Sequence, residues 1–339
     1  MPDRNAQSSA FGWDFQSNLA LYFASQDLKS LSRIKVEGPT EDIELFYEDG
    51  SSTFIQAKSQ LDPYSSSNTN LHLKNAIKTL IDASTKTDYS LLYYGSNISN
   101  PFVFKEFSNL FLTGPTDYSF HELPDKIKDK IKKYVDETAN NENLSLNNFD
   151  YNRLRITTLP FYGDNDDTRY RLIRHSVEIL LETLGLKSPQ INNVFTHYQL
   201  LFTQNSSKAI DIKKVDLAWP IIIYSLDTTS EEFFSEFDLD VSEEDAIENI
   251  YEDFIEKKSL EFTLFNEVSN EFLAFTKSES YQNKRSAAKE FIEKNCSDYS
   301  KKLFFGELDE MSEPVTQLIL WKIIKKIRVI RKLSKEVGL

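Results

Sequence analysis

The chain has 339 residues, of which 40% are hydrophobic and 27% are charged, and its formal net charge is −14. This composition is typical of a globular protein, and the length suggests two domains or one large one, because single cores rarely grow beyond about 250–300 residues. The acidic charge excludes binding of nucleic acid through bulk electrostatics alone. The single cysteine, Cys296, excludes an internal disulfide framework, and the four histidines lack the spacing of a histidine metal site.

The first hundred residues predict elements in the order α-β-β-β-α-β. Apolar periodicity indicates the helices, and short alternating or apolar runs indicate the strands. The pair Asp49-Gly50 supplies the positive-φ residues of a hairpin turn between the second and third strands. The expected ranges are 11–31 for the first helix, 33–37, 42–47 and 52–59 for three strands, 71–83 for the second helix and 89–94 for the fourth strand.

The second half of the chain predicts a separate, mainly α-helical domain. Residues 123–148 are rich in Lys, Asp and Asn, so we place the domain boundary near residue 148, which gives domains of 1–148 and 149–339. Apolar spacing predicts a helix over 169–184, with Gly185 as its stop. Residues 219–226 fit either a strand or a buried helix.

Two charged segments of this half have alternative interpretations. Residues 231–256 contain twelve acidic residues and no Lys or Arg, which fits a solvated helical face, a partner surface or a DNA mimic. The amphipathic helix expected over 315–335 carries seven Lys or Arg residues between Trp321 and Lys335. It fits a packed helix with a solvated side, or an oligomer or DNA interface.

No membrane segment or leader is expected. The sequence contains no uninterrupted apolar run of about 18 residues, the length that predicts a membrane-spanning helix. The first residues are polar and are not followed by the apolar stretch of a signal peptide. The expected compartment is therefore the cytoplasm, with no membrane partner.

One constellation of residues predicts chemistry. Gln56 and Lys58 lie two residues apart on one expected strand and share a face. The hairpin brings Asp42 within reach of both. Asp42, the Gln56 carbonyl and the backbone carbonyl of Ala57 are the hard oxygen donors that Mg²⁺ prefers. Lys58 would orient or deprotonate a water molecule and stabilise charge during phosphodiester hydrolysis. The same triple also occurs by chance, and Glu37 also fits a solvated strand residue.

The pattern Asp42-x13-Gln56-Ala57-Lys58 resembles the PD-(D/E)xK nuclease superfamily in its D…QxK variant. Over about residues 10–100 the chain looks like the double-stranded-DNA nuclease domain of bacterial anti-phage effectors. That domain occurs in the CBASS-associated endonuclease and in the nuclease subunit of Lamassu-type systems. The matching segments are Phe11-Gly12-Trp13-Asp14-Phe15-Gln16, Val36-Glu37, Glu41-Asp42-Ile43 and Ile55-Gln56-Ala57-Lys58.

The resemblance implies a restriction-endonuclease-like αβββαβ core and metal-dependent cleavage of double-stranded DNA, with Mg²⁺ or Mn²⁺ as cofactor. It carries over Asp42, Gln56 and Lys58 as catalytic positions, with Glu37 and Gln16 in support. The general superfamily pattern has an acid at the Gln56 position. Because a neutral amide binds Mg²⁺ more weakly, metal affinity would then depend on phosphate oxygens of the DNA.

The resemblance also implies control by other components. Residues 150–339 are short for the cyclic-oligonucleotide sensor of the CBASS enzyme, which favours a Lamassu-like subunit. Its expected partners are an SMC-like ATPase and a small accessory subunit, and activation through a homo-oligomer is a further expectation. The alternatives are a non-enzymatic scaffold with a vestigial site and a stand-alone restriction-like endonuclease. Glu44 lies two residues after Asp42 on the same face, which fits a neighbour of the metal, but a surface role is the expectation for it. The four histidines are expected to have structural or surface roles.

Overall fold

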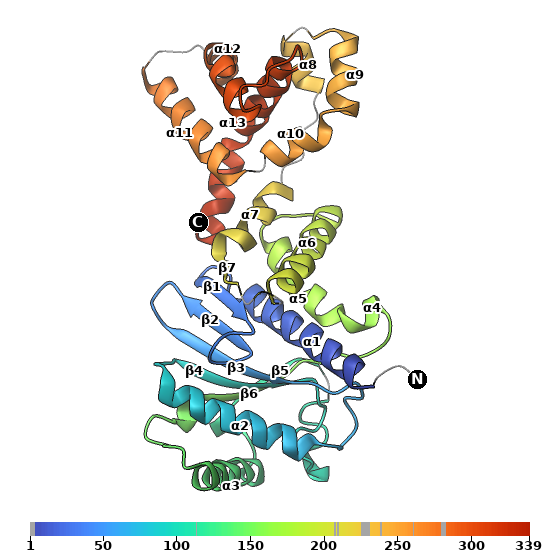
Figure 1. Ribbon diagram of the computed structural model, residues 1–339, viewed down its shortest axis with the longest axis vertical. Coiled ribbons are helices and arrows are strands. Elements are labelled where there is room, and N and C mark those ends of the chain that lie inside the picture. Colours follow the sequence, from blue (N-terminus) through green and yellow to red (C-terminus); the bar gives the residue numbers. More distant parts are fainter. Residues whose placement is uncertain are drawn as a thin grey trace. The chain divides into compact units, whose positions relative to one another are not determined.

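A computed structural model describes residues 4–112, 114–206, 208, 210–224, 231–237, 239–259, 261–278 and 283–339. The chain divides into two compact units, Met1–Ile221 with Val337–Leu339, and Ile222–Glu336 (Figure 1). The first unit thus continues well past the boundary expected near residue 148. The reason is that a strand beyond residue 148 completes its sheet, as the strand order shows.

A mixed sheet forms the centre of the first unit, and within the described residues its order is β5-β6-β4-β3-β2-β1-β7 (Figure 1). The strands are β1 (Leu31–Val36), β2 (Ile43–Tyr47), β3 (Ser52–Lys58), β4 (Leu91–Ser96), β5 (Thr116–Ser119), β6 (Leu154–Thr158) and β7 (Ile212–Lys213). Strand β6 pairs in parallel with β4 and antiparallel with β5. Residues on both sides of position 148 therefore share one hydrogen-bonded sheet.

The hairpin between β2 and β3 forms as the sequence predicts. Gly50 adopts a φ of 84°, and the Asp49 carboxylate accepts a hydrogen bond of 2.9 Å from the Ser51 amide. Strands β2 and β3 are antiparallel, with Ile43 opposite Ile55. This register places Asp42, the residue before β2, level with Gln56.

Helices α1 (Arg4–Gln26) and α2 (Thr69–Lys86) lie on opposite faces of the sheet (Figure 1). Helix α1 approaches β4 closely at Gly95, where an added Cβ would lie 2.7 Å from a methyl group of Leu19. Helix α1 ends five residues earlier than the range 11–31 predicts, because Leu31 already begins β1. The order α-β-β-β-α-β of the first hundred residues is confirmed.

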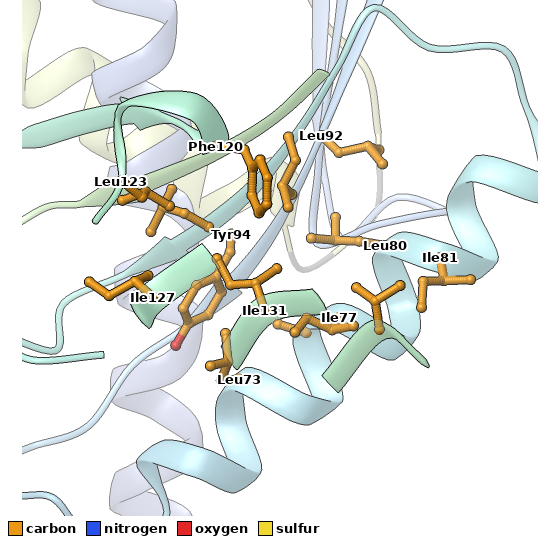
Figure 2. Close-up of a cluster of buried hydrophobic side chains, with 14 of the residues drawn as sticks. Leu73, Ile77, Leu80, Ile81, Leu92, Tyr94, Phe120, Leu123, Ile127 and Ile131 are labelled. Atoms are coloured by element: carbon orange, nitrogen blue, oxygen red, sulfur yellow. The ribbon is translucent and has the colours of Figure 1, made fainter. Parts of the chain in front are cut away.

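The α2 face of the sheet is covered by a second helix, α3 (Asp125–Glu142), which the sequence did not predict. Ile127, Ile131, Val135 and Ala139 recur every four residues along α3 and are buried. The first three of them pack with α2 and β4 around side chains such as Leu80 in an apolar core (Figure 2). The remaining positions of α3 are polar, so the composition of 123–148 resembles a linker although one stripe of the helix belongs to the core.

The remaining elements of the first unit are α-helices and three short 3₁₀ helices. Helices α5 and α6 pack against α1, and hydroxyls of Ser25 and Ser176 share a hydrogen bond of 2.6 Å between α1 and α5. Of the segment 219–226, residues up to Tyr224 are helical, and the last two lie outside the described residues. These elements are η1 (Lys105–Phe107), η2 (Phe120–Glu122), η3 (Tyr151–Arg153), α4 (Asp166–Arg169), α5 (Arg171–Thr183), α6 (Ser188–Ser206) and α7 (Lys214–Tyr224).

All the secondary-structure elements described in the second unit are helices. Its helices are α8 (Glu231–Phe237), α9 (Val241–Asn249), α10 (Glu252–Ser259), α11 (Phe262–Ser278), α12 (Lys284–Leu303) and α13 (Ser312–Val337). The acidic segment forms α8 to α10, and its aromatic residues pack inward: the ring of Phe237 lies 5.7 Å from that of Trp321 on α13. The helix predicted over 315–335 corresponds to α13, and its apolar stripe is buried.

Candidate active site

A tight loop between β1 and β2 holds Asp42 in place. Its backbone is closed by hydrogen bonds from the Glu37 amide to the Asp42 carbonyl (2.8 Å) and from the Gly38 amide to the Glu41 carbonyl (3.1 Å). Glu37 adopts a left-handed φ of 56°, which is uncommon for a residue with a side chain. The chain reverses within six residues, so Glu37 and Asp42 lie at the same end of the sheet.

Glu44 stabilises this loop through hydrogen bonds of its buried side chain. The surface role expected for Glu44 is therefore wrong. Its side chain is buried, and its carboxylate accepts hydrogen bonds from the backbone amides of Thr40 (2.7 Å) and Glu41 (3.3 Å). Gly38 leaves room for that carboxylate, since an added Cβ would lie 2.3 Å from Glu44 Cδ. Glu44 is therefore a structural anchor of the loop that carries Asp42.

The carboxylate of Asp42 contacts β3 at three successive residues. Its Oδ2 accepts hydrogen bonds from the Ala57 amide (2.9 Å) and from the side-chain amide of Gln56. The Lys58 ammonium lies 3.8 Å from the same oxygen. Burial raises the pKa of Asp42, and the positive charge of Lys58 and the Ala57 hydrogen bond oppose that rise. The structure thus brings together the three residues on which the predicted chemistry depends.

Gln56 is buried and oriented by α2. Its Oε1 accepts a hydrogen bond from the Thr79 hydroxyl, while its Nε2 donates to Asp42. A metal beside Asp42 requires the opposite orientation of this amide, with the carbonyl oxygen toward the metal. Thr79 supports both orientations, because a hydroxyl can donate to the carbonyl or accept from the amide. The orientation of a glutamine amide is assigned from its hydrogen-bond network.

Glu37 and Gln16 lie at the same site, as the sequence predicts. Burial and the negative charge of Asp42 raise the pKa of Glu37, while the Gln16 amide opposes this rise. The same amide opposes the rise in the pKa of Asp42. The Gln16 Oε1 atom is buried without a hydrogen-bond partner. Helix α1 therefore places the Gln16 side chain beside the carboxylates of both Glu37 and Asp42.

Glu41 is a site residue that the sequence prediction missed. Only 4% of its surface is exposed, and neither carboxylate oxygen has a hydrogen-bond partner. Burial raises its pKa to about 8; the negative charge of Asp42 adds to this rise, and Lys58 opposes it. The nearby Thr79 hydroxyl also opposes the rise in this pKa, although in the present orientation of the Gln56 amide it donates to Gln56. The only sign of Glu41 in the sequence was its position next to Asp42. That position did not show that the Glu41 side chain is buried.

His72 of α2 is also close to the site, although no site role was expected for it. It is half-buried, and burial together with the positive charge of Lys58 lowers the pKa of its imidazole. His72 is therefore favoured in its neutral form beside Lys58.

The donor set fits a hard cation. Asp42, Gln56 and the Ala57 carbonyl offer only oxygen atoms, which suit Mg²⁺ or Mn²⁺. Across the residues that the structure describes, no three His, Cys, Asp or Glu side chains gather closely enough to hold a metal ion. A metal at Asp42 would therefore combine at most two acidic side chains with neutral oxygens. The buried, unpartnered oxygens of Glu41 and Gln16 are further acceptors beside this set.

Comparison with known proteins finds only weak similarity. No family profile and no curated protein matches the sequence. Among solved structures, the chain is similar to the Cap4 SAVED/CARF-domain containing receptor of Acinetobacter baumannii, including its structure with the cyclic trinucleotide 3'3'3'-cAAA. The identities are 15% and 14%, the TM-score is 0.38 in both, and the matches cover 68% of this chain.

The matches cover 50% and 49% of the two receptor chains, so this chain spans about half their length. At such identity and TM-score the similarity supports no inference about activity or ligand. Among the described residues, no helix has both the length and the apolar character needed to cross a membrane.

Proposed function

We propose that the protein is a metal-dependent phosphodiester hydrolase that cleaves DNA. The observation that carries this proposal is the convergence of Asp42, Gln56 and Lys58 at one end of the β2–β3 hairpin. Both Gln56 and Lys58 reach Asp42 Oδ2, one through a hydrogen bond and the other at 3.8 Å. The α-β-β-β-α-β order of the surrounding elements and the sequence resemblance to PD-(D/E)xK nucleases support the same function.

The residues suit hydrolysis of a phosphodiester by water. Asp42, the Gln56 carbonyl and the Ala57 carbonyl would hold Mg²⁺ or Mn²⁺, which supplies charge neutralisation and lowers the pKa of a bound water. Lys58 is one-quarter exposed, so its ammonium can contact a phosphate that enters from solvent. There it would orient the attacking water and stabilise the negative charge that develops on the phosphoryl oxygens. Glu37 and Gln16 would keep the Asp42 carboxylate in position.

The sequence resemblance further supports an effector role in prokaryotic anti-phage or anti-plasmid defence, with double-stranded DNA as the substrate. In that role, an SMC-like ATPase and a small accessory subunit would hold the nuclease inactive until assembly or release. Association of several copies would be a second route to activation. The net charge of −14 fits weak DNA binding by the isolated chain.

The test is cleavage of supercoiled plasmid by the full chain, with Mg²⁺ or with EDTA, over a series of protein concentrations. We expect nicking and linearisation in Mg²⁺ that Asp42→Ala and Lys58→Ala abolish. Lys78→Ala is the matched control, because Lys78 is an exposed lysine of α2 paired with Glu142. Cutting that survives in both site variants would refute the proposal. If the isolated wild-type chain is silent, the same comparison is made with its co-purified partners, where silence of the complex would favour a scaffold.

A further inference from the structure

The candidate site contains hydrogen-bond acceptors that lack donors. Among the described residues, eight buried side-chain nitrogen or oxygen atoms have no hydrogen-bond partner. Three of them lie at this site, namely both carboxylate oxygens of Glu41 and Oε1 of Gln16. All three are acceptors when Glu41 is ionised, the form that binds a metal. What is missing from the site is therefore a positive or hydrogen-donating group.

The protein's own donors nearby are already engaged. With the Gln56 amide oriented as in this structure, the Thr79 hydroxyl donates to Gln56, and the Ala57 amide donates to Asp42. In the opposite orientation, which a metal requires, the Thr79 hydroxyl accepts from the Gln56 amide and can donate to one Glu41 oxygen, so the other oxygen still has no donor. The backbone amide of Glu41 itself points to the Glu44 carboxylate at 3.3 Å. The protein thus places Glu41 in its interior with at most one donor for its two carboxylate oxygens, an arrangement that is unfavourable for a charged group.

The charges around Glu41 point to a cation. Asp42 and Asp82 both add negative charge in its vicinity, and Lys58 opposes them. Lys58, however, lies against Asp42, at 3.8 Å from its Oδ2. Gln56 is neutral, so β3 contributes no negative charge to a metal at this site. One divalent cation would balance the charges of Asp42 and Glu41 together.

We propose that Glu41 is a ligand of the metal at this site and supplies the second negative charge that the neutral Gln56 lacks. This inference rests on the metal dependence of the proposed function. Two carboxylates and two neutral oxygens form a donor set for Mg²⁺ or Mn²⁺, which leaves the remaining positions to water and phosphate oxygens. Gln16 Oε1 would accept a hydrogen bond from a water molecule held by the metal.

The test is the binding of Mn²⁺ to the full chain, measured by calorimetry and by the rise in melting temperature over protein in EDTA. The variants are Glu41→Gln, Asp42→Asn and, as the matched control, Asp82→Asn. Asp82 also adds negative charge near Glu41, but it is paired with Lys86. We expect Glu41→Gln and Asp42→Asn each to weaken Mn²⁺ binding by at least about tenfold, as the loss of a charged ligand does. Asp82→Asn should bind Mn²⁺ as the wild type does.

The melting temperature in EDTA separates ligation from a structural role. If Glu41 is a metal ligand, Glu41→Gln melts in EDTA at the wild-type temperature or higher, because the variant removes a buried carboxylate without a partner. Unchanged Mn²⁺ binding in Glu41→Gln alongside weakened binding in Asp42→Asn would overturn the role of Glu41 and leave the proposed function standing. A wild type that binds no Mn²⁺, either alone or with a DNA duplex, would overturn both.

Discussion

Two neighbouring regions on the same face of β3 differ in how their buried side chains are paired. Phe54 joins the apolar core between the sheet, α2 and α3, whose members are close-packed and buried (Figure 2). Gln56, two residues further along, joins a polar cluster in which buried carboxylate oxygens have no donor. Helix α2 takes part in both regions, through Leu80 in the core and Thr79 in the cluster. The core stabilises the fold, whereas the unpaired acceptors of the cluster cost stability, as is expected of the catalytic site that we propose.

The largest expected effect is on catalysis. Lys58→Ala should lower the rate of DNA cleavage by at least about 100-fold, because the variant removes the cation that stabilises transition-state charge. The melting temperature should change little, since the Lys58 ammonium is partly exposed and contacts Asp42 only at 3.8 Å. Plasmid cleavage and thermal denaturation of the same preparations measure both quantities. A large loss of stability without loss of activity would show that Lys58 stabilises the fold and does not act in catalysis.

A substitution in the core should have the opposite profile. Leu80→Ala removes a fully buried side chain of the α2 core, and such truncations destabilise proteins by about 2–5 kcal/mol. Denaturant titration should show this loss, while the rate per folded molecule stays at the wild-type value. If Leu80→Ala abolished cleavage in a protein that is still folded, the core and the cluster would not be separable.

The pH dependence of stability should identify Glu41. Its pKa in the folded protein is raised from 4.5 to about 8, so folding favours the protonated form. The stabilisation is fully present below about pH 4.5 and is lost as the pH rises through 8, and it amounts to at most about 5 kcal/mol. In EDTA, the difference in melting temperature, Glu41→Gln minus wild type, should therefore increase as the pH is raised from about 5 to about 9. A constant difference would show that Glu41 titrates normally.

The smallest effect is expected from Thr79→Val, which keeps the shape of the side chain and removes its hydroxyl. Gln56 then loses the partner that orients its amide, at a cost of about 1 kcal/mol, the usual net value of one hydrogen bond. We expect Mn²⁺ affinity to change only a few-fold and cleavage to persist. Calorimetry of this variant beside Glu41→Gln measures the difference between an orienting residue and a ligand. An effect of Thr79→Val as large as that of Glu41→Gln would contradict this ranking.

Local signals in the sequence were sufficient to predict the hairpin and the residues it brings together. Asp49-Gly50 and the alternating strands set the register, and the register determines that Asp42 meets Gln56 and Lys58. The same signals identified Asp42 but could not determine the burial of its acidic neighbours Glu41 and Glu44. Whether each of them is buried, and with which partner, depends on the left-handed backbone at Glu37 and on contacts with α2 that are distant in sequence.

The predicted domain boundary shows the same limit on a larger scale. Strand β6 enters the sheet between β5 and β4, and its apolar alternation is short, with Leu154 and Ile156 as its two apolar residues. Arg155 pairs with Asp117 of the neighbouring edge strand β5, at 2.8 Å. Only pairing over long sequence separations shows that residues beyond 148 belong to the first unit. A short strand, β6, was therefore placed in the second domain, and the helix α3 with its one apolar stripe was missed within the first.

The most direct test of the central claim compares wild-type protein with Lys58→Ala on supercoiled plasmid at matched concentrations, in Mg²⁺ and in EDTA. The account predicts cutting by the wild type in Mg²⁺ alone, by the isolated chain or by its assembled complex, and none by the variant. Equal cutting by both proteins, or cutting that persists in EDTA, would show that this cluster is not a metal-dependent phosphodiesterase site.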